Sequence, residues 1–152
     1  MSNPYASIFQ VRVEGADLVC AATRATWFGG GHDPDDSGDT ASGFSTKKNP
    51  GCFGCALPLD FNRPRNNPCA GSPLGIIPWF TPVAVTNLHG GGTVQVKLID
   101  LGPSAPPNAH AGIDLTVAAF EQLGGNLRVG ELTVSWRIIG GAKFLRKGAA
   151  VA

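Results

Sequence analysis

Alternation of apolar and polar residues predicts strands in several short stretches of the chain. Residues 8–13 (IFQVRV), 93–99 (TVQVKLI) and 132–138 (LTVSWRI) place apolar side chains at every second position, which is typical of a half-buried strand. The first of these is alternatively an N-terminal extension. The apolar segment 18–28 (LVCAATRATWF) predicts one bent strand or two short ones, and 82–87 (PVAVTN) predicts another. The pattern favours a mainly β fold.

A helical pattern follows late in the chain. Residues 116–123 (TVAAFEQL) predict one short helix with Thr116 as its N-cap, and Gly124 and Gly125 supply its C-terminal stop. Between the strands lie a Gly-rich polar loop at 29–43 and a long Cys- and Pro-rich insertion at about 44–80. Because short strands expose their edges unless the sheet closes, these elements predict a small closed barrel.

Composition narrows the function classes. The chain has 152 residues, a net charge of +1, only 15% charged residues, 21 Gly and 12 Pro, which fits one turn-rich domain. The balance of charge argues against a nucleic-acid binder. No apolar run approaches the length of a membrane-spanning helix. The first 20 residues lack a basic segment followed by an apolar one, so we expect no signal peptide.

Four cysteines leave three interpretations open. Cys20, Cys52, Cys55 and Cys69 allow three disulfide connectivities, between which the sequence does not choose. We favour disulfides over free thiols, and both over zinc, because Cys52-x-x-Cys55 has no second such pair and no well-spaced His pair to complete a metal site.

Three segments in order resemble a known family. They are Ala-Thr-Trp-Phe-Gly (25–29) with Asp-Thr-Ala-Ser-Gly (39–43), Val-Ala-Val-Thr-Asn (83–87) with the stretch ending Asp-Leu-Gly-Pro (100–103), and Gly-Ile-Asp-Leu-Thr (112–116) with the helix and final strand. This pattern resembles the double-psi β-barrel of rare lipoprotein A, a superfamily shared with expansins, barwin-like proteins and family 45 endoglucanases. The resemblance implies a six-stranded barrel with one or two short helices.

The resemblance also divides the chain. It covers about residues 22–139, which form the barrel of a single domain spanning 1–152. Residues 1–21 are then an N-terminal extension, and 140–152 a flexible tail.

The resemblance implies a role for one acid. In the enzymes of this superfamily, the Asp of the Ile-Asp-Leu-Thr motif donates a proton to a glycosidic oxygen, and the matching residue is Asp114. An alternative is that Asp114 caps the helix that begins near Thr116. Asp39 or Asp36 is the candidate second carboxylate of an inverting hydrolase, whose two carboxyl groups lie ~6.5–9.5 Å apart.

Two expected residues of the glycan-cleaving relatives are replaced in this chain. Phe44 stands where those proteins carry Glu after Thr-Ala-Ser-Gly, and Cys-Phe-Gly-Cys (52–55) occupies the region of their His. These replacements favour a non-catalytic module, as expansins and barwin-like proteins are.

Further residues are candidates for ligand binding. Trp27 and Trp79 have flat rings suited to stacking on sugars, whereas Trp136 alternates with apolar residues and is expected in the core. Asp100 is expected to bond the turn that follows it and to line the groove. His110 is a candidate to assist Asp114, or is an exposed loop residue.

One loop carries the spacing of a calcium site. The alternating oxygen side chains Asp33, Asp35, Ser37 and Asp39 are typical of the start of a calcium loop. The alternative is a solvated turn in which the Asp side chains bond their own backbone.

These observations together predict recognition of a cell-wall polysaccharide, peptidoglycan or β-glucan, with cleavage by Asp114 as general acid. The alternatives are a non-catalytic glycan-binding module and a secreted interaction protein such as a protease inhibitor. The resemblance implies an extracellular or periplasmic protein. We expect a monomer with no organic cofactor and no nucleic-acid partner.

Overall fold

The computed structural model describes residues 4–30, 36–61, 66–104 and 110–146. Its elements run in the order β1 (Val11–Glu14), β2 (Asp17–Phe28), β3 (Gly54–Leu57), β4 (Pro82–Asn87), β5 (Gly92–Leu101), β6 (Ile113–Thr116), α1 (Val117–Gln122), β7 (Leu132–Ile138) and the 3₁₀ helix η1 (Gly141–Phe144). No helix in these ranges is long and apolar enough to cross a membrane.

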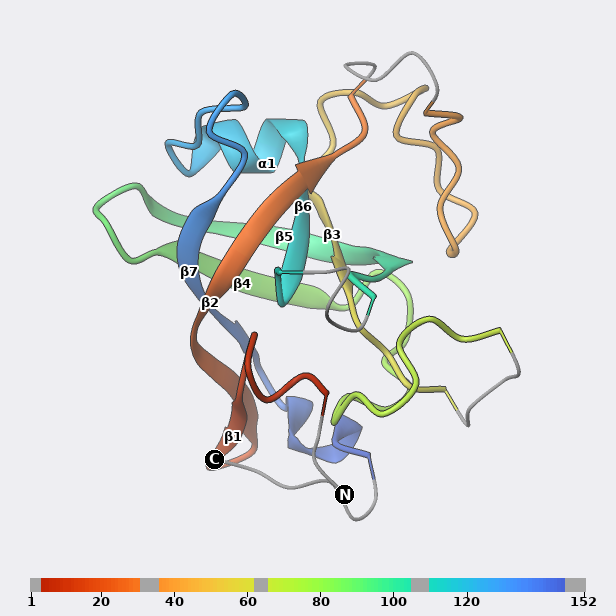
Figure 1. Cartoon of the computed structure of the whole chain (residues 1–152), viewed down its shortest axis with the longest axis vertical. Helices are drawn as coiled ribbons and strands as arrows, with labels where there is room; N and C mark the ends of the chain where they lie inside the picture. Colours follow the sequence, from red (N-terminus) through yellow and green to blue (C-terminus); the bar gives the residue numbers. More distant parts are fainter. Residues whose placement is uncertain (1–3, 31–35, 62–65, 105–109, 147–152) are drawn as a thin grey trace.

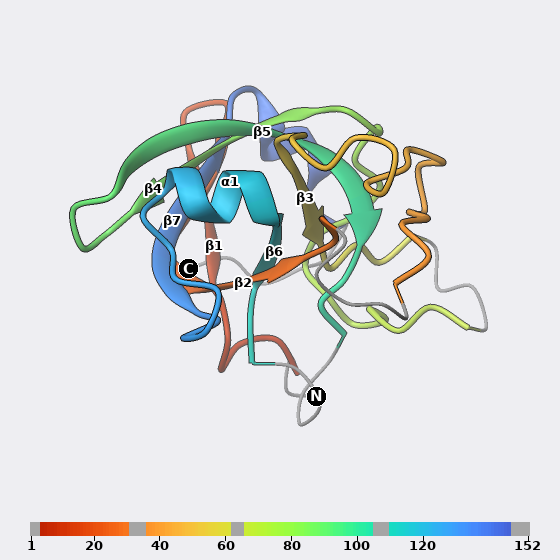
Figure 2. The ribbon, with the colours of Figure 1, turned by 90° about the horizontal axis from the view of Figure 1, so that it is seen from above.

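The sheet closes on itself. Its strands run in the order β1-β2-β6-β3-β5-β4-β7, and β7 pairs with β2 as well, so that six strands form a closed barrel with β1 attached to the outside of β2 (Figure 1). The pairs β2–β6 and β3–β5 are parallel, and the other pairs are antiparallel. Figure 2 looks toward α1, which lies over one end of the barrel. The predicted mainly β, six-stranded barrel is confirmed.

Apolar residues of all the barrel strands fill the interior. The alternation on β5 sends Val94, Val96 and Leu98 inward, and β7 contributes Val134 and Trp136. All five are buried, and they belong to one continuous core cluster. The sequence interpretation of Trp136 as a core residue agrees with this position.

Two strands of the barrel lie where the sequence pattern indicated none. β3 sits inside the insertion expected at 44–80, and all four of its residues are buried. β6 carries the Ile-Asp-Leu-Thr motif, and it runs directly into α1. Both strands have four residues, too few for alternation to be recognised against neighbouring turns.

The chain ends pack onto the barrel. Barrel pairing begins at Leu18, opposite Ile138, earlier than the expected start at residue 22. Tyr5, within the expected N-terminal extension, is fully buried. After β7 the chain continues as η1, where the Ala142 N–H donates to the Ala16 carbonyl at 2.9 Å. The segment 140–146 therefore differs from the flexible tail expected from residue 140, because it forms η1 and its backbone is hydrogen-bonded to the rest of the chain.

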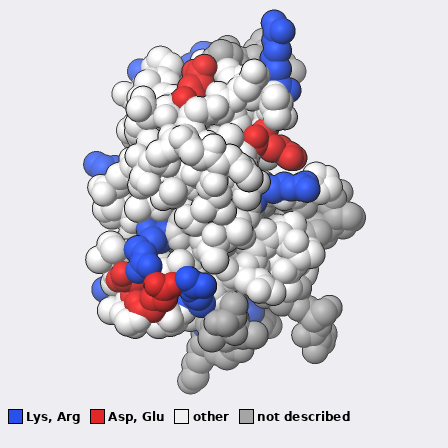
Figure 3. All heavy atoms as spheres, turned by 90° about the vertical axis from the view of Figure 1, so that its left-hand side faces the viewer, with Lys and Arg blue, Asp and Glu red and all other residues white. Residues whose placement is uncertain are grey.

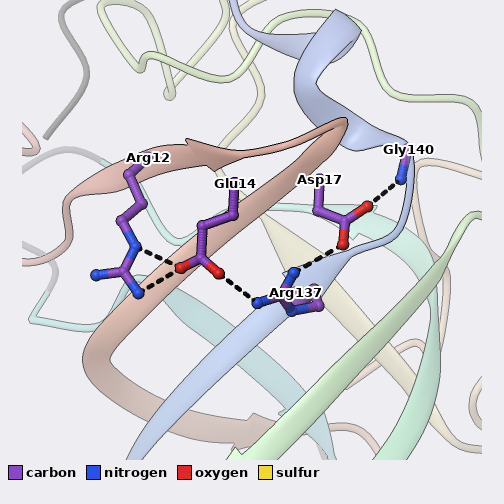
Figure 4. A network of polar contacts seen from close by, with 5 residues as sticks. All are labelled: Arg12, Glu14, Asp17, Arg137 and Gly140. Carbon is purple, nitrogen blue, oxygen red and sulfur yellow. Dashed lines mark hydrogen bonds and ion pairs between the residues drawn. The ribbon is translucent and has the colours of Figure 1, made fainter.

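A charged network fastens β1 to this end of the barrel (Figure 4). Arg137 on β7 donates to Asp17 and to Glu14, both at 2.7 Å. Asp17 also accepts the Gly140 N–H at 2.9 Å, and Arg12 pairs with Glu14. On the face shown in Figure 3, charged side chains are sparse, and acidic and basic groups gather in one mixed cluster near its lower edge.

The insertion is fastened by hydrogen bonds and not by a disulfide. The Asp60 carboxylate, which is 2% exposed, accepts the Gly71 N–H at 2.9 Å and lies 3.4 Å from Arg146. The backbone of the C-terminal segment adds bonds to the same insertion, from the Gly75 N–H to the Phe144 carbonyl and from the Arg146 N–H to the Pro73 carbonyl.

The four cysteines, all within the described ranges, are free thiols. The predicted disulfide framework is therefore not found. Cys20, Cys55 and Cys69 are buried on separate elements of the core cluster, where each behaves as a small apolar side chain. Burial raises the pKa of the Cys20 and Cys69 thiols to about 11.

Candidate functional site

Four residues from four neighbouring strands form one row across the outside of the barrel. Thr26 on β2 pairs with Asp114 on β6, Asp114 with Ala56 on β3, and Ala56 with Asp100 on β5. Residues opposite one another on paired strands point to the same face of a sheet. Because Ile113 and Leu115 on either side of Asp114 are fully buried, this row faces outward, and we call it the acidic row.

A register shift places Asp100 in the row. On β5, Leu98 pairs with Cys55, but Asp100 and not Ile99 pairs with the next residue of β3. Simple alternation from Leu98 would turn Asp100 toward the apolar interior. The extra residue at Ile99 re-aims the side chain that follows it, as bulges do, and brings the Asp100 carboxylate to the face that carries Asp114.

The freed backbone of the bulge holds the loop that precedes β3. The Ile99 carbonyl accepts the Ser42 N–H at 3.1 Å, and the Asp100 carboxylate accepts the Ala41 N–H at 2.9 Å. The same carboxylate oxygen accepts the Leu101 N–H at 2.8 Å, within β5 itself. The Thr-Ala-Ser-Gly segment thus lies against one end of the acidic row.

Asp114 has the environment of a proton donor. Desolvation by the surrounding protein raises the pKa of its carboxyl group from 3.8 to about 6. The Thr26 hydroxyl donates to Asp114 Oδ1 at 2.8 Å, which lowers the pKa, and the negative charge of Asp100 raises it. A carboxyl group with such a pKa holds its proton in a substantial fraction of molecules near pH 6.

Asp114 does not cap the helix. Thr116 is the N-cap residue of α1, but its side chain makes no capping bond. Its hydroxyl instead donates to the Cys52 carbonyl at 2.7 Å and accepts the Gly54 N–H at 3.0 Å. The alternative interpretation of Asp114 as a cap is therefore wrong, because the N-cap residue is Thr116 and Asp114 lies within β6.

The predicted second carboxylates, Asp36 and Asp39, lie in the loop whose following segment bonds Asp100. Asp36 accepts the Gly38 N–H through Oδ1 at 2.9 Å, and Asp39 is exposed, with its N–H bonded to the Ser37 hydroxyl at 3.2 Å. These are the local turn bonds of the solvated-loop interpretation. The carboxylate whose charge acts on Asp114 is that of Asp100.

The candidate calcium loop is described only in part. Asp33 and Asp35 lie outside the described residues, whereas Ser37 and Asp39 bond within their own turn. Within the described ranges, no three His, Cys, Asp or Glu side chains gather as a metal site would require.

The two predicted aromatic residues pack against the core, and the predicted histidine is exposed. Trp27 packs against the core, and its Nε1 donates to the Leu127 carbonyl at 3.1 Å. Trp79, expected to be exposed, is half-buried and also packs against the core. His110 is exposed, in accordance with the interpretation of a loop residue.

An aromatic hollow that sequence reasoning missed lies along the outer face of β5. It has a volume of about 520 Å³. It is lined by Phe44, Cys52, Phe53, Gly54, Phe80, Gln95, Lys97 and Ile99. Phe53 and Phe80 are 39% and 47% exposed, and Phe80 packs edge-on against Phe44, with 6.4 Å between ring centres.

No family model matches the sequence, and no curated protein matches it. Among solved structures, the chain is similar to an apo expansin of Clavibacter michiganensis, with 19% identity and a TM-score of 0.45 over 86% of this chain and 52% of that one. A variant of Clavibacter michiganensis expansin in complex with cellohexaose gives 18% identity and a TM-score of 0.44, with the shares 86% and 52%. The Streptomyces papain inhibitor gives 22% identity and a TM-score of 0.46, covering 79% of this chain and 94% of that one. This chain spans about half the length of the expansin structures.

Proposed function

We propose that the protein recognises a cell-wall polysaccharide, peptidoglycan or β-glucan, along the acidic row and cleaves it with Asp114 as general acid. The observation that carries the proposal is the raised pKa of Asp114, about 6, on the outer face of a closed barrel. Its role of proton donor to the glycosidic oxygen is what the resemblance to the double-psi barrel enzymes implies for this position. Because the proposed ligand is a polysaccharide of the cell wall, the proposal includes a location outside the cytoplasm, in the periplasm or the extracellular space.

Asp100 is the proposed partner of Asp114. The two residues are separated by a single strand, so their Cα atoms lie roughly 9–10 Å apart at ordinary strand spacing. This scale suits an inverting hydrolase, in which the second carboxylate activates a water molecule on the far side of the sugar ring. One oxygen of Asp100 accepts the Ala41 and Leu101 N–H groups, and the other oxygen is the one proposed to bind the water molecule.

The alternative is a glycan-binding module without catalysis. Phe44 and Cys52, at or near the positions of the expected Glu and His, both line the aromatic hollow. That part of the surface therefore supplies apolar contact where the glycan-cleaving relatives supply polar groups. Binding without cleavage is the expected behaviour if Asp114 only hydrogen-bonds a sugar hydroxyl.

The experiment compares four proteins on insoluble peptidoglycan and β-glucan. Wild type, Asp114→Asn, Asp100→Asn and Asp39→Asn are incubated with each polymer, and both bound protein and released sugars are measured. We expect wild type to release sugars, Asp114→Asn and Asp100→Asn to release at least about a hundredfold less, and Asp39→Asn to match wild type.

The other outcomes separate the alternatives. Binding without release by wild type excludes catalysis and leaves the binding module. Equal losses in Asp39→Asn and Asp100→Asn would contradict the assignment of Asp100 as the partner. Absence of both binding and release on every polymer would overturn the glycan proposal as a whole.

A further inference from the structure

The aromatic hollow carries a second inference, independent of the acidic row. Three Phe rings, the Ile99 side chain and the half-buried Cys52 thiol form its apolar walls, and the Gln95 and Lys97 side chains are its polar lining. Its volume of about 520 Å³ is within the range of small-molecule sites, which are mostly apolar with a few polar groups that orient the ligand.

One wall residue of the hollow, Phe80, has an unfavourable backbone conformation. Phe80 has φ of 69° and is the one residue other than glycine with a positive φ within the described ranges. A bulky residue in this conformation is strained, and such strain concentrates at ligand sites. The Phe80 N–H is held by the Leu98 carbonyl at 2.7 Å, so the neighbouring strand fixes the conformation that keeps the ring at the hollow, about half exposed.

The floor of the hollow depends on a missing side chain. A Cβ atom at Gly54 would lie 2.6 Å from Ile99 Cδ1. Because Gly54 has no side chain, the side chain of the bulged Ile99 packs directly on the backbone of β3, and Ile99 is only 3% exposed. The hollow thus owes an apolar wall to the same bulge that turns Asp100 outward.

Charge along β5 orients a ligand. Gln95 and Lys97 lie at one end of this face, and Asp100 follows Ile99 at the other. Lys97 forms no ion pair with any of the described residues. An anionic group is therefore attracted toward Lys97 and repelled from Asp100, while an apolar body can pack against the exposed Phe rings.

We propose that the aromatic hollow binds a small aromatic carboxylate, with its ring against Phe53 and Phe80 and its carboxylate at Lys97. Sugars are disfavoured as occupants, because the walls supply few hydrogen-bonding groups for the many hydroxyls of a sugar ring.

The test uses cinnamate, with cinnamyl alcohol as its uncharged match, in titration calorimetry. We expect saturable binding of one cinnamate per chain and about fivefold weaker binding of the alcohol, since a partly exposed ion pair contributes an effect of this size. Lys97→Met should weaken cinnamate binding about fivefold and leave the alcohol unaffected. Lys143→Met, which removes the same charge beside Phe144 on η1, should change neither affinity.

A second variant tests the aromatic wall without endangering the fold. Phe80→Gly removes the ring and places glycine where φ is positive, a conformation that glycine adopts freely. We expect an unchanged or higher melting temperature together with about tenfold weaker cinnamate binding. Phe53→Ser, at an exposed wall residue, should also weaken binding.

Four results would overturn the proposal. The first is absence of any heat of binding at millimolar cinnamate. The others are equal affinity for cinnamate and cinnamyl alcohol, equal affinity of Lys97→Met and Lys143→Met for cinnamate, and full cinnamate affinity in Phe80→Gly.

Discussion

Replacing Asp114 by Asn should stabilise the protein at neutral pH and have no effect in acid. The pKa of the Asp114 carboxyl group is about 6 in the folded protein, against an ordinary value of 3.8. Between these values the folded state binds more protons than the unfolded state, so the free energy of unfolding falls as the pH rises. Above pH 6 the folded protein carries the full cost of a charged, desolvated carboxylate, which Asn does not have.

The size of the effect follows from the same difference. At about 1.4 kcal/mol per pKa unit, a rise from 3.8 to about 6 corresponds to about 3 kcal/mol. The Asp114 side chain is half-buried and solvent screens part of its charge, so we expect a smaller difference of about 2 kcal/mol. Asn retains an oxygen that can accept the Thr26 hydroxyl, so the substitution keeps the contact that holds the side chain.

The assay is urea unfolding of wild type and Asp114→Asn from pH 4.0 to 8.0. The variant should exceed wild type by about 2 kcal/mol at pH 7.5, and the difference should narrow below pH 6 and disappear near pH 4. Glu121→Gln, which removes one exposed negative charge on α1, serves as the control and should show no such pH dependence. A constant difference between wild type and Asp114→Asn across this range would refute the raised pKa.

Two further predictions concern the site and the thiols. Thr26→Val removes the hydrogen bond that favours the charged form of Asp114; the pKa of Asp114 should therefore rise above 6, which carboxyl-carbon NMR titration measures, and an unchanged or lower pKa would contradict the assigned role of Thr26. Because all four cysteines are free thiols, alkylation in denaturant without reductant should add four labels, whereas in native protein half-buried Cys52 should react first; two labels or none in denaturant would indicate disulfides.

Sequence patterning located the strands whose two faces differ. The segments 82–87 and 132–138 were predicted with the bounds of β4 and β7, because each alternates between the core and a solvated face. The same rule fails for β3, since all four of its residues are buried and Gly, Cys, Ala and Leu show no alternation. A prediction based on one polar face cannot find a strand that has none.

The candidate site was predictable only in part, for a similar reason. Asp114 follows from the resemblance to the double-psi barrel enzymes, and its neighbours on β6 confirm that it points outward. The position of Asp100 depends on the register shift at Ile99, and the exposure of Phe80 depends on a left-handed backbone. The register shift and the left-handed backbone are both set by pairing between strands that are distant in sequence. The sequence therefore predicted Trp79 as the exposed aromatic residue, whereas the exposed ring is that of Phe80.

The cysteines illustrate the same limit in the core. Their spacing and the Pro-rich surroundings favoured a disulfide as the fastening of the insertion, yet that fastening comes from the Asp60 carboxylate and from backbone bonds to residues 144–146. Asp60 and Arg146 are too far apart in the sequence for any local pattern to connect them. The thiols of Cys20, Cys55 and Cys69 are buried and pack as small apolar groups.

One inserted residue links the acidic row to the aromatic hollow. With Ile99 in place, β5 sends Asp100 to the face of Asp114, frees the Ile99 carbonyl for the Ser42 N–H, and lays an apolar side chain over Gly54. Without Ile99, alternation would bury the Asp100 carboxylate among the core residues beside Leu98, and burial of an unpaired charge is strongly destabilising. The bulge therefore makes an outward pair of acids compatible with an apolar barrel, and the hollow beside them is a consequence of the same change in register.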